Sequence, residues 1–334
     1  MPETPVPARP VPRRSFERTT LAGVLLLACG AAAPGSPDLA MPERIVWGFR
    51  DGVPFNQPRG IAIDGVRGEV VVANTGAHRI EIFSLAGRPL ERMVHRVRAA
   101  DGSWRDGLPR CVAIAADGSY LVADNLASAI SVLDRRGRVK GTLEPSFRVS
   151  GSASALHVSR TGDVWVGGPP RDDRVHRFDA SLDSVSVWGE SGAAAGSLKN
   201  ITAITTLPDG DVAVACAGTE LAIQIFSPDG TFRFGFGVHD LGPGNFSLPS
   251  GIAATDDGRL WISDEIRQNV QVFDLKGTYI GAFGGKGLGP SDFLYPSALA
   301  SDRKATVAVA EREAGRIQIF SVIGGGEGSE PKPQ

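Results

Sequence analysis

The chain has 334 residues, of which 22% are charged, and it contains 42 glycines and 23 prolines. Its formal net charge of −2 leaves no excess of arginine and lysine to neutralise phosphates, so we expect no nucleic-acid partner. The many turn-forming residues and the scarcity of helix-favouring runs favour a fold of many short strands, and closed all-β folds of this length form one domain.

The first 29 residues have the layout of an export signal. An apolar stretch from Leu21 to Ala28 precedes Cys29, and it is too short to span a hydrocarbon core of about 30 Å. Four arginines come before it: Arg9, Arg13, Arg14 and Arg18. The segment resembles a lipoprotein signal peptide, in which the thiol of Cys29 accepts a lipid and becomes the new N-terminus. Residues 13–18 also resemble the twin-arginine export motif, with Glu17 where an apolar residue is usual.

This resemblance implies an exported protein that lipid on Cys29 attaches to the membrane of the cell envelope, on the periplasmic or extracellular side. Residues 1–29 are then the signal peptide. Residues 30–42 are rich in Ala, Pro, Gly and Ser and predict a flexible tether. Residues 323–334 predict a disordered tail by their composition.

One pattern recurs six times between residues 43 and 322. Its clearest copies are Gln57–Asp64, Leu108–Ile114 and Leu248–Ala253, and weaker copies begin at residues 153, 201 and 296. Equivalent positions lie 44 to 51 residues apart, at Gly60, Cys111, Ala155, Ala203, Gly251 and Ala298. Six units of one length therefore make up the folded part of the chain.

Each unit predicts four strands in one order. A small-apolar strand leads through a glycine turn to a second strand such as Tyr120–Asp124 and then to a third strand with period-two alternation, such as Asn269–Phe273. A turn such as Pro228–Gly230 precedes the fourth strand, as in Thr278–Gly284. Four antiparallel strands form one blade, and radial repetition of blades protects the sheet edges. The predicted fold is an all-β, six-bladed β-propeller.

The motifs Pro-x-Gly-Ile-Ala, Val-Ala-Asp/Asn, His-Arg-Ile-x-Ile-Phe and Phe-Gly-x-x-Gly resemble those of the NHL repeat, and the resemblance covers residues 43–322. Units three and four depart from it, with Gly168 and Cys216 where an acidic residue is expected. The sixth unit has no fourth strand after Phe320, whereas residues 44–49 form an orphan strand-like segment. We expect this N-terminal strand to complete the last blade and close the ring.

The resemblance implies that the first strand of each blade lines a central channel, and that the loops entering the first strand and leaving the second share one face. Two arginines between Pro and Gly, together with the polar residues that end the second strands, would then meet at one end of the channel. A small polar or anionic ligand could bind there, although the acidic residues could instead serve the fold. The candidate ligand-binding residues are Arg59, Asn74, Arg110, Asp124, Asp264 and Glu311.

Metal catalysis is the sharper alternative. The chain resembles two groups of six-bladed enzymes that use a metal ion. The peptide-amidating lyase has a zinc ion bound by histidines, and the gluconolactonase group has a divalent cation bound by carboxylates. The histidines do not supply a zinc site, because only His157 falls on an inner strand. A calcium or magnesium ion on oxygen ligands fits better, and the candidate ligands are Asn74, Asp124, Asp264 and Glu311. Cys216 has no histidine aligned beside it and is not expected to be a nucleophile.

The sequence therefore predicts no catalytic residue and no required cofactor. The best hypothesis is an envelope lipoprotein whose propeller binds or scaffolds another envelope protein, a peptide, a glycan or a small polar ligand, and the alternative is a divalent-metal-assisted lyase or lactonase. Cys111 and Cys216 lie in blades two and four, too far around the ring for a disulfide, so we expect two free thiols.

The export hypothesis makes a direct prediction. Replacement Cys29→Ser removes the acyl acceptor, and we expect it to abolish lipid labelling and to move the protein from the membrane to the soluble fraction after detergent-free lysis. Retention of the variant in the membrane fraction would argue against lipidation at Cys29.

Overall fold

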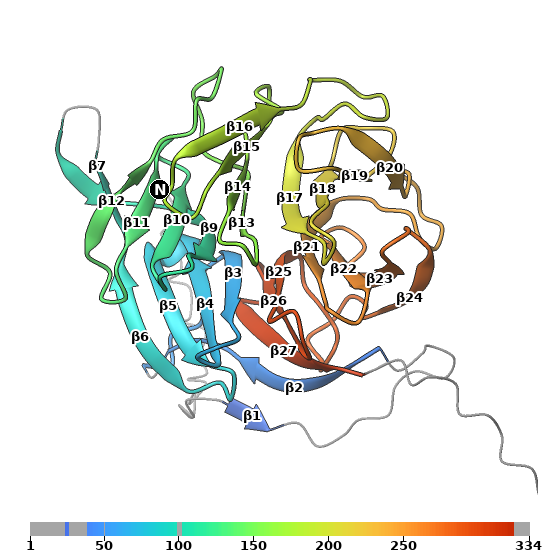
Figure 1. The fold of residues 1–334 in the computed structure, drawn as a ribbon. Coiled ribbons are helices and arrows are strands. Elements are labelled where there is room, and N and C mark those ends of the chain that lie inside the picture. The colour runs from blue at the N-terminus through green and yellow to red at the C-terminus, as the bar shows by residue number, and fades with distance from the viewer. Residues whose placement is uncertain (1–23, 27–38, 50, 99–101, 324–334) are drawn as a thin grey trace, which may run out of the picture.

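The computed structural model describes residues 24–26, 39–49, 51–98 and 102–323. Cys29, most of the predicted signal peptide and tether, and the predicted tail after residue 323 lie outside the described residues. Six antiparallel sheets are arranged radially around a central channel (Figure 1). The predicted six-bladed β-propeller is thus confirmed.

The first three blades each contain four consecutive strands. Blade 1 has β3 (Pro58–Asp64), β4 (Glu69–Asn74), β5 (Arg79–Ser84) and β6 (Pro89–Val94). Blade 2 has β9 (Pro109–Ile114), β10 (Tyr120–Asp124), β11 (Ile130–Leu133) and β12 (Val139–Leu143). Blade 3 has β13 (Ala155–Val158), β14 (Val164–Gly167), β15 (Val175–Phe178) and β16 (Ser184–Trp188).

The last three blades follow the same order, except that the outer strand of blade 6 comes from the N-terminal part of the chain. Blade 4 has β17 (Ile201–Thr206), β18 (Val212–Cys216), β19 (Ile223–Phe226) and β20 (Phe232–Phe236). Blade 5 has β21 (Pro249–Ala254), β22 (Arg259–Asp264), β23 (Asn269–Asp274) and β24 (Tyr279–Phe283). Blade 6 has β25 (Pro296–Ser301), β26 (Thr306–Glu311), β27 (Arg316–Val322) and β2 (Ala40–Val46).

The hydrophobic core lies between blades. Each of the six apolar clusters takes its side chains from two neighbouring blades, including one cluster that joins blade 6 to blade 1. Trp261 of blade 5 and Phe320 of blade 6, for example, are fully buried in the same cluster. Since no blade covers both of its own faces, the blades are stable only as neighbours in a ring.

Polar residues in the third strands also serve the ring. Gln224, Gln271 and Gln318 are buried, and each side-chain amide bonds the loop that precedes its blade. For Gln271, the side-chain oxygen accepts from the Gly244 N–H at 3.0 Å and the amide donates to the Asn245 carbonyl at 2.7 Å. The polar residue in the alternating pattern of each of these strands is therefore a buried glutamine that bonds the inter-blade loop.

Strand β2 closes the ring, as predicted. It pairs antiparallel with β27, from Ala40 opposite Val322 to Val46 opposite Ile317, and it buries Ile45 and Val46. The pairing starts earlier than the sequence suggested, at Ala40 within the predicted tether, because β27 continues past Phe320 and offers more backbone partners. Strand β1 (Val24–Leu26), within the predicted signal peptide, pairs with the outer edge of β2.

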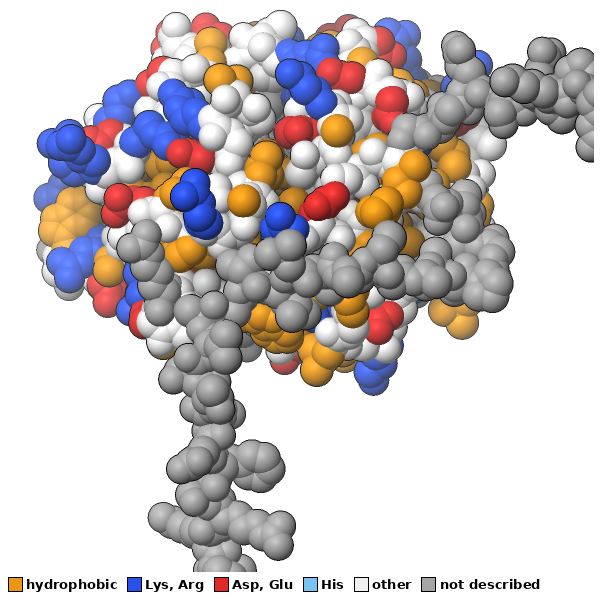
Figure 2. Space-filling view, turned by 90° about the horizontal axis from the view of Figure 1, so that it is seen from below, with side chains coloured by type: hydrophobic (Ala, Val, Ile, Leu, Met, Phe, Trp, Pro, Cys, Tyr) orange, Lys and Arg blue, Asp and Glu red, His pale blue; other side chains and the backbone are white. Residues whose placement is uncertain are grey.

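The described surface carries no dominant charge on the face shown in Figure 2, where basic and acidic side chains are interspersed with apolar ones.

A short hairpin of β7 (Arg96–Arg98) and β8 (Trp104–Asp106) interrupts the connection between blades 1 and 2. Among the described residues, no helix has the length and apolar character needed to cross a bilayer. Both described cysteines, Cys111 and Cys216, are free, as predicted.

Ring closure can be tested by truncation. We expect a chain that starts at Asp51 to lose about 3 to 6 kcal/mol of unfolding free energy relative to one that starts at Leu39, because burial of Ile45 and Val46 contributes about 1.5 to 3 kcal/mol each. Chemical denaturation of both chains measures the difference. Equal unfolding midpoints would mean that β2 does not close the ring.

Candidate functional site

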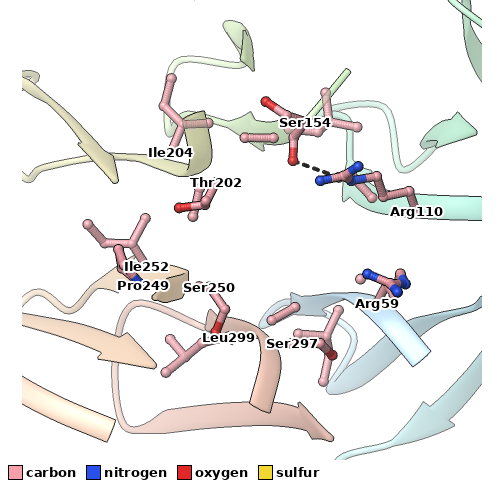
Figure 3. A pocket seen from close by; sticks show the side chains of 18 of the residues that line it. Arg59, Arg110, Ser154, Thr202, Ile204, Pro249, Ser250, Ile252, Ser297 and Leu299 are labelled. Carbon is pink, nitrogen blue, oxygen red and sulfur yellow. Dashed lines mark hydrogen bonds between the residues drawn. The ribbon is translucent and has the colours of Figure 1, made fainter. Parts of the chain in front are cut away.

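A cavity of about 270 Å³ opens at the end of the channel where the inner strands begin, which we call the channel mouth (Figure 3). Each blade contributes one lining residue, which occupies the middle position of the Pro-x-Gly motif or of its counterpart in the weaker repeats. These six residues are Arg59, Arg110, Ser154, Thr202, Ser250 and Ser297. The predicted channel-facing position is therefore confirmed in every blade.

A β-bulge explains why this position faces the channel. In five of the six inner strands the register shifts here, so that the residue has no partner on the second strand, as Arg59 has none between Pro58 and Gly60. Such a bulge redirects a side chain. The following glycine allows neighbouring inner strands to approach, because a Cβ on Gly60 would lie 2.6 Å from the Arg110 carbonyl oxygen.

The hydroxyl groups at the channel mouth also tie blades together. The Ser250 hydroxyl donates to the Pro296 carbonyl at 2.5 Å, and that of Ser297 donates to the Pro58 carbonyl at 2.7 Å. Each of these bonds joins an inner strand to the next one around the ring. The hydroxyl oxygens keep lone pairs for a ligand, but their protons serve the fold.

Arg59 and Arg110 carry the charge of the cavity. Among the described residues, no carboxylate lies within ion-pair distance of either guanidinium group; Glu265, which also lines the cavity, pairs with Arg312 at 2.9 Å. Burial lowers the pKa of Arg59, and the nearby charges of Arg312 and Arg110 lower it further. Two cations from adjacent blades thus lie at one cavity without a direct counter-ion.

The other four predicted site residues do not line this cavity. All are at most 2% exposed, and they bond backbone groups of nearby loops: Asn74, Asp124, Asp264 and Glu311. Asp264 is the clearest case, because its carboxylate accepts from four backbone N–H groups, at Ser247, Leu248, Ile266 and Arg267. The predicted convergence with the arginines is therefore absent, since these side chains turn toward the loops instead of the channel.

Glu311 forms the most enclosed of these networks. Its carboxylate accepts from the Leu294 N–H at 2.8 Å, from Arg316 Nε at 2.6 Å and from the Gln318 amide at 2.9 Å. Burial raises the pKa of Glu311, while Arg316 and the hydrogen bonds oppose this shift. The guanidinium of Arg316 also lies over the Trp47 ring at 5.1 Å, which links the network to the segment after β2.

Two residues that the sequence interpretation missed compensate for Gly168 and Cys216. Asp172 accepts from the Arg148 N–H at 2.6 Å, and Asp173 accepts from the Asn200 N–H at 2.8 Å. A Cβ on Gly168 would lie 2.3 Å from Asp172 Oδ2, so the glycine makes room for this carboxylate. The signal in the sequence was the Asp-Asp pair that follows shortly after the unusual Gly168.

No metal site is assembled by these groups. Among the described residues, no three His, Cys, Asp or Glu side chains gather where they could hold a metal ion. The oxygens proposed for calcium or magnesium belong to four different blades. In the described structure these four side chains bond nearby loops and do not gather around one point of the channel.

The two other residues considered for chemistry are in unreactive settings. Burial raises the pKa of the Cys216 thiol to about 12, which keeps it protonated. Burial, assisted by Arg303, lowers the pKa of His157 to about 3, so its imidazole is neutral near pH 7. Neither residue lies among those that line the cavity at the channel mouth.

The fold and these motifs define the class of protein. Residues 55–83, which span β3 to β5 of blade 1, match the family model described as NHL repeat. This chain is a six-bladed β-propeller whose first blade is similar to the NHL repeat. No curated protein matches the sequence.

Several solved structures share the fold. A protein of unknown function from Bacteroides thetaiotaomicron is 15% identical, with a TM-score of 0.64 over 83% of this chain and 72% of its own. A gluconolactonase from Xanthomonas campestris is 16% identical, with a TM-score of 0.62 over 89% of this chain and 99% of its own. Virginiamycin B lyase from Staphylococcus aureus is 17% identical, with a TM-score of 0.55 over 80% and 96%. At these identities the likeness extends to the fold alone.

The loop-anchoring role of Asp264 can be separated from metal binding. We expect Asp264→Ala to lower the free energy of unfolding by about 3 kcal/mol or more, because backbone N–H groups bonded to a charged acceptor lose their partner. Denaturant unfolding of both proteins, with calcium and with a chelator, provides the measurement. The result would indicate a metal ligand instead if the chelator lowered the stability of the wild type but not that of Asp264→Ala.

Proposed function

We propose that this chain is an envelope-attached binding protein whose propeller holds a small anionic ligand at the channel mouth. The observation that carries the proposal is the pair of guanidinium groups, Arg59 and Arg110, in one cavity without a carboxylate within ion-pair distance among the described residues. A guanidinium group matches the two oxygens of a carboxylate or phosphate with parallel hydrogen bonds. A ligand of this kind would supply the missing negative charge.

The cavity has the other properties of a small-ligand site. It is concave, and the mobility of its polar residues is restricted, because the hydroxyl groups of Ser250 and Ser297 are fixed to neighbouring strands. Its volume of about 270 Å³ lies just below the range of about 300 to 1,000 Å³ typical of drug-sized ligands. A free metabolite, or an acidic terminus of a peptide or glycan, fits this size better than a folded protein surface.

Lactonase and lyase activities, which the names of two fold neighbours bring to mind, receive no support from a specific observation. The acidic residues that could serve such chemistry are buried and hydrogen-bonded to loops. Binding therefore remains the better interpretation of the channel mouth.

The attachment to the envelope is the second part of the proposal. It rests on the lipoprotein-like segment that ends at Cys29. A chain that begins at Cys29 lacks β1 and would enter the fold at Leu39, whose carbonyl accepts from the Ile323 N–H at 3.0 Å, and would continue directly into β2. The lipid-bearing end would thus be joined to the closing strand of the ring, which holds the propeller at the membrane by a short connection.

Removal of the two guanidinium groups tests the binding site. We expect Arg59→Gln/Arg110→Gln to weaken the binding of small carboxylates by at least about 10-fold, because hydrogen bonds to charged groups contribute about 1.5 to 3 kcal/mol each. Isothermal titration of the wild type and the variant with sodium hexanoate and sodium phosphate measures the effect. The matched control is Arg88→Gln/Arg136→Gln, which makes the same change in net charge at exposed positions. Equal anion affinity in all three proteins would refute the proposed site.

A further inference from the structure

A belt of apolar side chains lies directly below the arginines. Each inner strand contributes the residue two positions after its channel-mouth residue, and side chains two apart in a strand point to the same side. The belt consists of Ile61, Val112, Leu156, Ile204, Ile252 and Leu299. Figure 3 shows Ile204, Ile252 and Leu299 beside the polar residues of the channel mouth. Five of the six are at most 7% exposed because they also belong to the apolar clusters between blades, so a small, rigidly packed part of each side chain faces the cavity.

The apolar belt lies between two cavities of the channel. Its six residues line both the cavity at the mouth and a second cavity of about 150 Å³ on the other side. In the second cavity, Arg303 of the β25–β26 turn reaches across the ring, with Nη2 at 3.1 Å from His157 Nε2 and 3.3 Å from Thr206 Oγ1. Positive charge therefore lies on both sides of the belt.

The two layers of the first cavity select for an amphipathic anion. A ligand bound to Arg59 and Arg110 has the apolar belt as the next surface that it meets. A polyhydroxylated ligand would lose water from its hydroxyl groups there without regaining hydrogen bonds. An ammonium group would lie beside the two guanidinium groups, and the carboxylate of Glu265, which also lines the cavity, is already paired with Arg312. An apolar body, by contrast, would make the free energy of binding more favourable, because water leaves the apolar surface of the belt.

Building on the proposed function, we infer that the ligand is a small carboxylic acid with a compact apolar body. The carboxylate binds the guanidinium groups of Arg59 and Arg110, and the hydrocarbon part packs on the apolar belt. The cavity volume limits this part to a short alkyl chain or a single ring.

A ligand series on the wild-type protein tests this inference. Isothermal titration with the sodium salts of acetate, butyrate and hexanoate is expected to show affinity rising by about fourfold for each added methylene group, as for full burial of a methylene group. Benzoate is expected to bind at least as tightly as butyrate. Gluconate, inorganic phosphate and hexylammonium chloride are expected to bind at least tenfold more weakly than hexanoate.

A conservative variant adds a second, independent measurement. Val112→Thr keeps the shape of the side chain but places a hydroxyl group in the belt, and it is expected to weaken hexanoate binding severalfold more than acetate binding. The control is Val139→Thr at an exposed position, which should change neither affinity. Thermal unfolding of both variants confirms that they are folded.

The outcomes separate the inference from the proposed function. Equal affinity for acetate and hexanoate, or tighter binding of phosphate or gluconate than of hexanoate, would overturn the apolar-acid inference while leaving an anion site at Arg59 and Arg110. Failure of every anion to bind would overturn both. Binding of hexylammonium as tightly as hexanoate would also overturn both, because the arginines would then not select the charge.

Discussion

The antiparallel pairing of β2 with β27 closes the ring of six blades. Each apolar cluster lies between two blades, so an open ring would leave the facing surfaces of two blades exposed. The closing strand comes from residues 40–46, far in sequence from β27 at residues 316–322. This long-range contact completes blade 6 and holds it against blade 1, which gives the channel a fixed circumference.

A fixed ring determines how the inner strands approach each other and therefore how the channel is lined. The bulge at Arg59 and the glycine at position 60 let β3 and β9 approach closely while the arginine turns inward. The serines at equivalent positions use their hydroxyl groups to join neighbouring inner strands. Blades 1 and 2 are the only described blades with a charged residue at this position, and this asymmetry gives one side of the channel mouth its positive charge.

The buried acidic residues stabilise the loops and take no part in the channel mouth. They accept hydrogen bonds from loop N–H groups that would otherwise be buried without partners, as seen for Asp264, Glu311, Asp172 and Asp173. Because these carboxylates are engaged at the loops, they do not offset the charge of Arg59 and Arg110. The same arrangement that stabilises the blades thus leaves a cationic cavity above an apolar belt, and this combination underlies the proposed preference for an amphipathic anion.

The number of blades, the order of their strands, the closing strand and the channel-facing position of Arg59 and Arg110 could all be predicted from the sequence. This was possible because strand alternation and the repeated Pro-x-Gly motif are local signals, written six times. The sequence did not determine where the side chains at the ends of the second strands point, because Asp124 and Asp264 can face either a channel or a loop from one position in a strand. The packed blades show that these side chains face the loops, and they show Asp172 and Asp173 in the place of the missing acidic residues of the motif. Their hydrogen-bond partners lie in loops up to 27 residues away, which are brought close only when the blades pack against one another.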